Sequence, residues 1–137
     1  MTGGPTAPGE PLYFGSPQAW RAWLAEHRAN TPELLVGFHK RGTGRPSLTW
    51  PESVEEALCF GWIDGVRRSA GSDAYTIRFT PRRPGSHWSR VNVELVARLE
   101  AEGRMTDAGR AAFAGRREDR TAQFSYEQAD VSISFRP

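Results

Sequence analysis

The sequence predicts one α+β domain in which a small antiparallel sheet packs against about four helices. The first observation is the order of hydrophobic periodicities, which runs helix, strand, helix, strand, helix, helix. The second is size, because 137 residues of which 38% are hydrophobic suffice for a single modest core. The third is the set of five tryptophans among 15 aromatic residues, which gives that core large side chains.

The N-terminal part is expected to begin with a disordered tail over residues 1–12, which are rich in glycine and proline. The domain itself is expected over residues 13–115. A first helix follows Ser16, a good capping residue, with Pro17 in the first turn. Its buried face carries side chains at helical spacing: Trp20, Trp23, Leu24 and His27.

The middle of the chain continues with a strand and a second helix. Residues 34–40 form a short apolar run typical of a strand, and residues 41–47 form a flexible loop. Thr49 and Glu52 have capping-box spacing, which predicts a helix with Pro51 in its first turn. Its buried face is expected to comprise Val54, Ala57, Leu58 and Trp62.

A second strand is expected over residues 74–80, where apolar and polar residues alternate strictly. This period places Tyr75, Ile77 and Phe79 toward the core. Arg78 therefore points to the opposite face of the sheet. The loop that follows contains the sequence PRRPGSHWS.

Two further helices are expected after this loop. Ser89 is a candidate cap for the third helix, and Gly103 is expected to end it. Thr106 is expected to begin a short fourth helix. Residues 116–137 are expected to be a polar tail, with strand-like alternation over 131–135.

The positive charge is concentrated in the middle of the chain. The net charge is only +2, but residues 63–90 contain six arginines against two aspartates. Of the 18 basic residues only Lys40 is a lysine, and arginine suits bidentate contacts with phosphate and carboxylate. An arginine-rich composition is also what a GC-rich genome produces, so the location of these arginines matters more than their number.

The first candidate site is a pocket for an anion. Arg82 and Arg83 lie between two prolines, which restrict the loop before any ligand binds. The start of the third helix offers free N–H groups and a positive dipole end. The residues expected to bind the ligand are Arg67, Arg68, Arg78, Arg82, Arg83, Ser86, His87, Trp88 and Ser89. The alternative is a solvated basic face in which Ser89 is only a helix cap.

Two residues are expected to support this pocket. Asp64-Gly65 is typical of a turn, which would bring Arg67 and Arg68 toward the other arginines. Asp64 is then expected to orient and partly balance one arginine, while Trp62 closes the core behind it.

Trp62 and Trp88 both adjoin the basic stretch, which allows two interpretations. Exposed indoles beside arginines suit stacking on a base, so nucleic acid is an alternative partner. Burial in the core is the other interpretation and the usual state of tryptophan. The modest net charge and the single lysine disfavour a broad surface that neutralises many phosphates.

An enzyme is a third possibility. Cys59, Asp64 and His87 together offer a thiol, a carboxylate and an imidazole, the groups of a nucleophile, an orienting acid and a base. A lone cysteine is more often a small buried hydrophobic residue, and no known nucleophile signature surrounds Cys59. No catalytic residue and no cofactor is predicted.

No metal site is predicted either, because His27, His39 and His87 lack the paired spacing of structural zinc ligands. One cysteine excludes an internal disulfide. No signal peptide and no apolar stretch of about 18 residues is visible, so we expect a cytoplasmic protein without membrane insertion.

Three blocks of the sequence resemble the YdeI/OmpD-associated family, also called bacteriocin-protection proteins. They are ALCFGWIDGVRRS, RFTPRRPGSHWSRVN and LEAEGRMTDAG, in the order and at the distances that the family shows, and the resemblance runs from about Ser16 to Ala112. The resemblance implies a bacterial role in stress or antimicrobial-peptide tolerance, and it implies no catalytic residues. Family members usually continue further, so this chain is short at its C-terminus or is a fragment.

The molecular function that these observations predict is binding of an anionic small molecule or phosphoryl group in an arginine-rich pocket. A nucleic-acid-binding module and an enzyme that uses Cys59 or Asp64 with His87 remain as alternatives.

Overall fold

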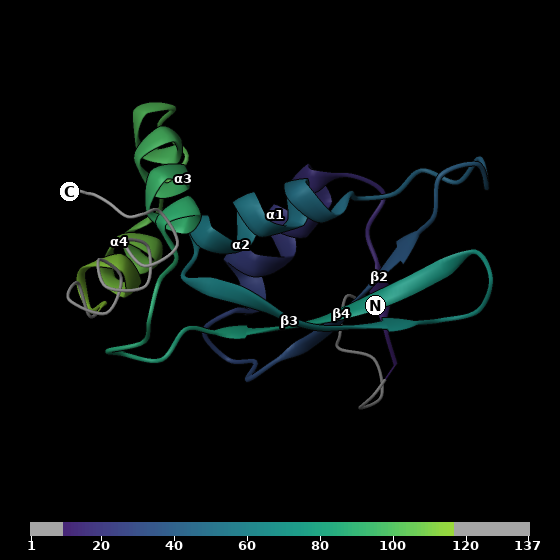
Figure 1. The fold of residues 1–137 in the computed structure, drawn as a ribbon, viewed down its shortest axis with the longest axis horizontal. Helices are drawn as coiled ribbons and strands as arrows, with labels where there is room; N and C mark the ends of the chain where they lie inside the picture. The colour runs from purple at the N-terminus through teal and green to yellow at the C-terminus, as the bar shows by residue number, and fades with distance from the viewer. Residues whose placement is uncertain (1–9, 117–137) are drawn as a thin grey trace, which may run out of the picture.

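A computed structural model describes residues 10–116 of the chain and confirms the α+β class (Figure 1). Two helices, α1 and α2, lie on one face of a four-stranded sheet, and α3 and α4 lie beyond one end of it. The element bounds are β1 Leu12–Tyr13, α1 Pro17–His27, β2 Leu34–His39, α2 Trp50–Cys59, β3 Trp62–Ser69, β4 Ala74–Pro81, α3 Arg90–Ala101 and α4 Asp107–Ala114. The predicted strand over 131–135 and most of the predicted N-terminal tail lie outside the described residues.

The sheet is mixed, with the strand order β1-β2-β4-β3. β2 pairs antiparallel with β4, and β4 pairs antiparallel with β3. The sequence predicted an antiparallel sheet. The short β1 instead pairs parallel with β2, so the prediction is wrong for this strand. Neither β1 nor β3 was predicted as a strand, because the first is only two residues long and the second was interpreted as a turn.

The four predicted helix starts are confirmed at the level of hydrogen bonds. Ser16, Thr49, Ser89 and Thr106 each accept a bond from a backbone N–H in the first turn of the helix that follows. Thr49 and Glu52 form the full capping box, with both reciprocal bonds present. These caps satisfy donors that the first turn cannot pair within the helix.

The predicted turn at Asp64-Gly65 is wrong, because both residues lie inside β3. The chain instead reverses at Phe60 and Gly61, where Gly61 has φ +80°, a conformation that favours glycine. The ladder with β4 then shifts register between Asp64 and Arg67, as in a β-bulge. Trp62 consequently belongs to β3 and not to the second helix, although it is buried as predicted.

The core lies between the sheet and α1 and α2, and tryptophan side chains fill it. The ring of Trp20 meets Phe79 edge-on at 5.1 Å, and Trp23 meets Trp62 edge-on at 5.9 Å. The predicted alternation in β4 is confirmed: Ile77 and Phe79 are buried, Tyr75 packs at the margin of the core, and Arg78 is exposed on the other face. Edge-on aromatic pairs of this kind add stability beyond the buried area.

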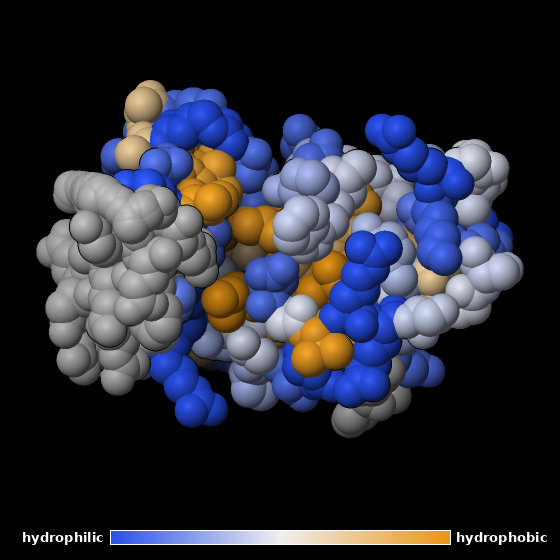
Figure 2. All heavy atoms as spheres, viewed as in Figure 1, coloured by the Kyte–Doolittle hydropathy of each residue, from blue (hydrophilic) through white to orange (hydrophobic). Residues whose placement is uncertain are grey.

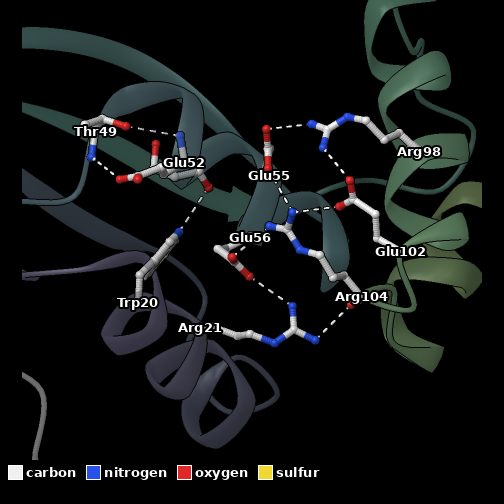
Figure 3. Close-up of polar contacts among 10 residues, drawn as sticks. Trp20, Arg21, Thr49, Glu52, Glu55, Glu56, Arg98, Glu102 and Arg104 are labelled. Carbon is white, nitrogen blue, oxygen red and sulfur yellow. Dashed lines mark hydrogen bonds and ion pairs between the residues drawn. The ribbon is translucent and has the colours of Figure 1, made fainter.

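An ion-pair network joins α1, α2 and α3 on the helical side (Figure 3). Arg104, which follows α3, pairs with Glu56 at 2.8 Å, with Glu55 at 3.1 Å and with Glu102 at 3.0 Å. Arg21 from α1 reaches the second oxygen of Glu56 at 2.9 Å and donates to the Arg104 carbonyl at 2.8 Å. Each of these guanidinium groups therefore has carboxylate partners, and Glu56 is almost fully buried between them.

The α4 helix is docked by close backbone contact with the end of α2. The Thr106 hydroxyl donates to the Cys59 carbonyl at 2.5 Å, and the backbone N–H of Thr106 donates to the same oxygen at 3.1 Å. Gly109 faces this carbonyl so closely that a Cβ there would overlap it. This contact holds α3 and α4 beside the end of the sheet, next to the loop that follows β4.

Candidate functional site

A surface cavity of about 240 Å³ lies where β4 ends and the chain turns toward α3. Its lining residues are Ile63, Thr80, Pro81, Arg82, Arg83, Ser86 and His87. The loop is anchored at both ends, because Arg82 N–H donates to the Gly61 carbonyl at 2.9 Å and Gly85 N–H donates to the Gly115 carbonyl at 2.8 Å. Gly85 has φ +76° and turns the loop back toward α3. The cavity wall is thus held in place by backbone bonds.

Arg82 is the central side chain of this cavity. Its guanidinium carbon lies 3.8 Å from the ring centroid of Trp88, whose indole is fully buried. One terminal nitrogen donates a long bond of 3.4 Å to the His87 carbonyl. The Nε atom is buried and has no hydrogen-bond partner in the described part of the chain. Arg82 is therefore a cation that stacks on an aromatic ring and has one N–H donor without a partner in the described residues.

The electrostatic environment of Arg82 is unusual for an arginine. Burial lowers the pKa of Arg82 to about 10, and the negative charge of Asp64 opposes this shift without reversing it. At neutral pH the side chain remains charged. The lowered pKa therefore expresses a desolvation penalty that no carboxylate in the described residues offsets by a direct ion pair.

Asp64 lies behind Arg82, beside a second and smaller cavity. The indole N–H of Trp50 donates to the Asp64 carboxylate at 3.1 Å, which fixes its orientation. The smaller cavity has a volume of about 10 Å³, close to that of one water, and Arg82 lines both cavities. Asp64 thus acts on Arg82 through space, as the sequence suggested, although it reaches that position from a strand and not from a turn.

Three further polar side chains face the larger cavity. Arg83 is exposed and has no ion-pair partner among residues 10–116. The Ser86 hydroxyl oxygen is buried without a hydrogen-bond partner in the same range. The His87 imidazole is exposed at the rim. Of the polar atoms at this cavity, Arg82 Nε and the Ser86 hydroxyl are therefore the buried ones without a partner in the described residues.

Four of the nine predicted ligand-binding residues therefore line one cavity: Arg82, Arg83, Ser86 and His87. Trp88 lies behind them as the surface on which Arg82 stacks. Ser89 caps α3 by accepting a bond from Asn92 N–H at 3.1 Å. Trp62 is a core residue that also borders the small cavity.

The other three arginines lie elsewhere, because the β3–β4 pairing carries them away from the cavity. Arg78 is on the opposite face from the core and pairs with Glu33 at 2.7 Å. Arg67 lies over the ring of Tyr75 at 3.8 Å. Arg68 is opposite Thr76 in the ladder. At about 3.4 Å per residue, Thr76 lies roughly 17 Å along β4 from Pro81, which lines the cavity.

The structure does not assemble Cys59, Asp64 and His87 into one site. Cys59 is fully buried at the end of α2, it does not line the cavity, and burial raises the pKa of its thiol. A raised pKa disfavours the thiolate that a nucleophile requires. Within residues 10–116 no group of three or more histidine, cysteine, aspartate or glutamate side chains is placed to hold a metal ion.

Sequence reasoning missed Ile63, Thr80 and Asn92 as cavity residues. Ile63 and Thr80 are directly opposite each other in the β3–β4 ladder, and both line the larger cavity. Asn92 reaches the smaller cavity from the first turn of α3. Only the strand pairing could have identified the first two, and β3 was not predicted to be a strand.

The chain matches the family described as "Domain of unknown function (DUF8412)" over residues 12–112. Because this match covers most of the 137 residues, the chain belongs to that family. No curated protein and no solved structure matches the chain. The family description carries no function, so the resemblance to YdeI/OmpD-associated proteins stays a prediction. Among the described residues, no helix has both the length and the apolar character needed to cross a bilayer.

Proposed function

We propose that the protein binds a small anion, a carboxylate or a phosphoryl group, in the cavity around Arg82. The observation that carries the proposal is the state of Arg82 itself. Its guanidinium is desolvated, stacked on Trp88 and left with a buried Nε that has no partner in the described residues. An anion placed against it would supply both the missing acceptor and the missing counter-charge.

The neighbouring residues define the charge and size of the ligand. Arg82 and Arg83 contribute two positive charges and Asp64 one negative charge, which suits an anion of low charge. The cavity volume of about 240 Å³ lies just below the usual range for small-molecule sites. The Ser86 hydroxyl can donate to an anion oxygen. The Ile63 side chain and the methyl group of Thr80 can contact a short carbon skeleton.

The test is a calorimetric titration with inorganic phosphate and, separately, with acetate, at constant ionic strength. We expect saturable binding that Arg83→Ala weakens about tenfold and Arg82→Met abolishes, because a charge-assisted hydrogen bond contributes about 1.5–3 kcal/mol. Arg110→Ala is the control, since it removes an exposed arginine charge on α4 that does not line the cavity.

Equal weakening in all three variants would show that only net charge matters, and the proposed site would then be wrong. Asp64→Ala provides a second check on the arrangement. We expect it to weaken phosphate binding more than it lowers the free energy of unfolding; the reverse would make Asp64 a structural residue only.

The cellular role that we propose is the one implied by the sequence resemblance, tolerance of stress or antimicrobial peptides by a cytoplasmic protein. It is supported by the three matching sequence blocks alone. Nothing in the cavity geometry favours a chemical reaction over binding.

A further inference from the structure

The face of the sheet that α1 and α2 leave uncovered carries a second set of side chains (Figure 1). One row of residues crosses all four strands on this face. Tyr13 pairs with Gly37, Gly37 with Thr76, and Thr76 with Arg68. At about 4.8 Å between strands, the backbones of Tyr13 and Arg68 lie roughly 14 Å apart. An aromatic ring and a cation thus occupy opposite ends of one row.

Tyr13 provides a flat and accessible ring at one end of the row. The residue is 42% exposed, and its ring stacks on His39 with a centroid distance of 4.5 Å and an interplanar angle of 16°. Gly37 makes this possible, because a Cβ at that position would lie 2.6 Å from the Tyr13 ring. The glycine therefore lets the tyrosine lie over the sheet, beside His39.

Basic residues follow His39 directly along the chain, in the loop that leaves β2. Lys40, Arg41 and Arg45 follow β2 and are all exposed. The backbone N–H of Lys40 donates to the Asp73 carbonyl at 2.9 Å, which holds this loop beside the β3–β4 turn. In the described part of the chain none of the three, nor Arg68, has a carboxylate partner. Figure 2 shows hydrophilic side chains interleaved with residues of intermediate hydropathy at this end of the molecule.

We propose that this face binds single-stranded nucleic acid. A base would stack on the exposed side of Tyr13, and the phosphates would contact Arg68 and the basic loop after β2. The combination of an open aromatic ring with unpaired cations fits unpaired bases, whereas a duplex keeps its base faces stacked on each other. This surface is separate from the cavity around Arg82, so the proposal does not depend on the anion site.

The test is fluorescence anisotropy with a labelled 12-nucleotide RNA of mixed sequence, its duplex, and an abasic strand of the same length. We expect the single strand to bind best and the abasic strand to bind at least about fivefold more weakly, since stacking contributes about 1–3 kcal/mol per base. Tyr13→Ala should lose that preference, while Tyr13→Phe should keep it. Arg68→Ala should reduce the slope of log K against log salt by about 0.7.

Arg110→Ala is again the control and should leave both the affinity and the preference nearly unchanged. Gly37→Ala adds an independent variant, because its methyl group displaces the Tyr13 ring without removing it, and it should weaken binding as Tyr13→Ala does. Circular dichroism and a urea midpoint show whether each variant is folded. Equal binding of the abasic strand, equal binding of the duplex, or no binding by the wild type at 50 mM salt would each overturn the proposal.

Discussion

Two groups of arginines in this protein differ in what faces their guanidinium groups. Around Arg104, on the helical side, carboxylates from α2 and from the end of α3 occupy the donors of three arginines. Around Arg82, at the end of β4, an indole ring and one carbonyl are the contacts, and a buried nitrogen has no partner in the described residues. The first group joins three helices, whereas the second leaves a buried donor without a protein partner in the described residues. The same residue type is therefore fully paired in one place, and in the other it has the unpaired donor on which our proposed anion site depends.

The largest expected effect comes from breaking the first group. Arg104→Met leaves the nearly buried Glu56 with one cation in place of two and removes a partner from Glu55. We expect the free energy of unfolding to fall by about 2–3 kcal/mol, somewhat below the range for fully buried pairs because Arg104 is 30% exposed. Urea denaturation followed by circular dichroism measures it, and a loss under about 0.5 kcal/mol would show that the network contributes little.

The corresponding change in the second group should have the opposite sign. Arg82→Met keeps an apolar stem on Trp88 and removes a cation whose pKa burial has lowered to about 10. Because the folded-state pKa lies below the unfolded one, the charge destabilises the fold at all pH values under about 10. We expect the free energy of unfolding at pH 7 to rise by about 1 kcal/mol while phosphate binding is lost. A loss of stability would assign Arg82 to the structural group.

A smaller effect is expected at the exposed margin of the first group. Arg98 pairs with Glu55 at 2.6 Å and with Glu102 at 3.0 Å, and its side chain is 46% exposed. Exposed pairs contribute little, so Arg98→Ala should lower the free energy of unfolding by much less than Arg104→Met does. Raising the salt concentration to 1 M should reduce this difference further, and the same urea series measures both.

The smallest expected effect is the pH dependence of that margin. Hydrogen bonds from Arg104 and then from Arg98 lower the pKa of Glu102 below its usual 4.5. A carboxylate with a lowered folded-state pKa contributes stability above the unfolded pKa and loses it as pH falls through the folded one. The difference between wild type and Arg98→Ala should therefore be constant from pH 5 to 8 and shrink near pH 3. A difference that persists at pH 3 would mean that Arg98 acts by packing.

Local signals in the sequence were sufficient to predict the helices. Ser16, Thr49, Ser89 and Thr106 mark helix starts because a cap depends only on residues within one turn. The alternation in β4 likewise depends on one strand and one buried face. These elements could be predicted without knowing their neighbours.

The strand β3 could not be predicted in this way. Asp64-Gly65 has the composition of a turn, but pairing with β4 holds it extended, and the register shift that follows absorbs the irregularity. The candidate site has the same limit. Its residues that are close in sequence were predicted, namely Arg82, Arg83, Ser86 and His87. Ile63 and Asp64 come to the cavities only through the β3–β4 ladder. The sequence also grouped Arg67, Arg68 and Arg78 with Arg82, although the ladder separates them.

The irregular pairing of β3 also bears on how copies of this protein behave toward one another. β3 is the last strand of its sheet, and a regular, uncharged last strand offers a free row of N–H and C=O groups to any other extended chain. Here the register shift bends that row, and Arg67 and Arg68 place two positive charges just beyond the bend. A second copy that approached edge to edge would meet a mismatched backbone and like charges. The register shift and these charges thus make β3 a poor template for growth into fibrils.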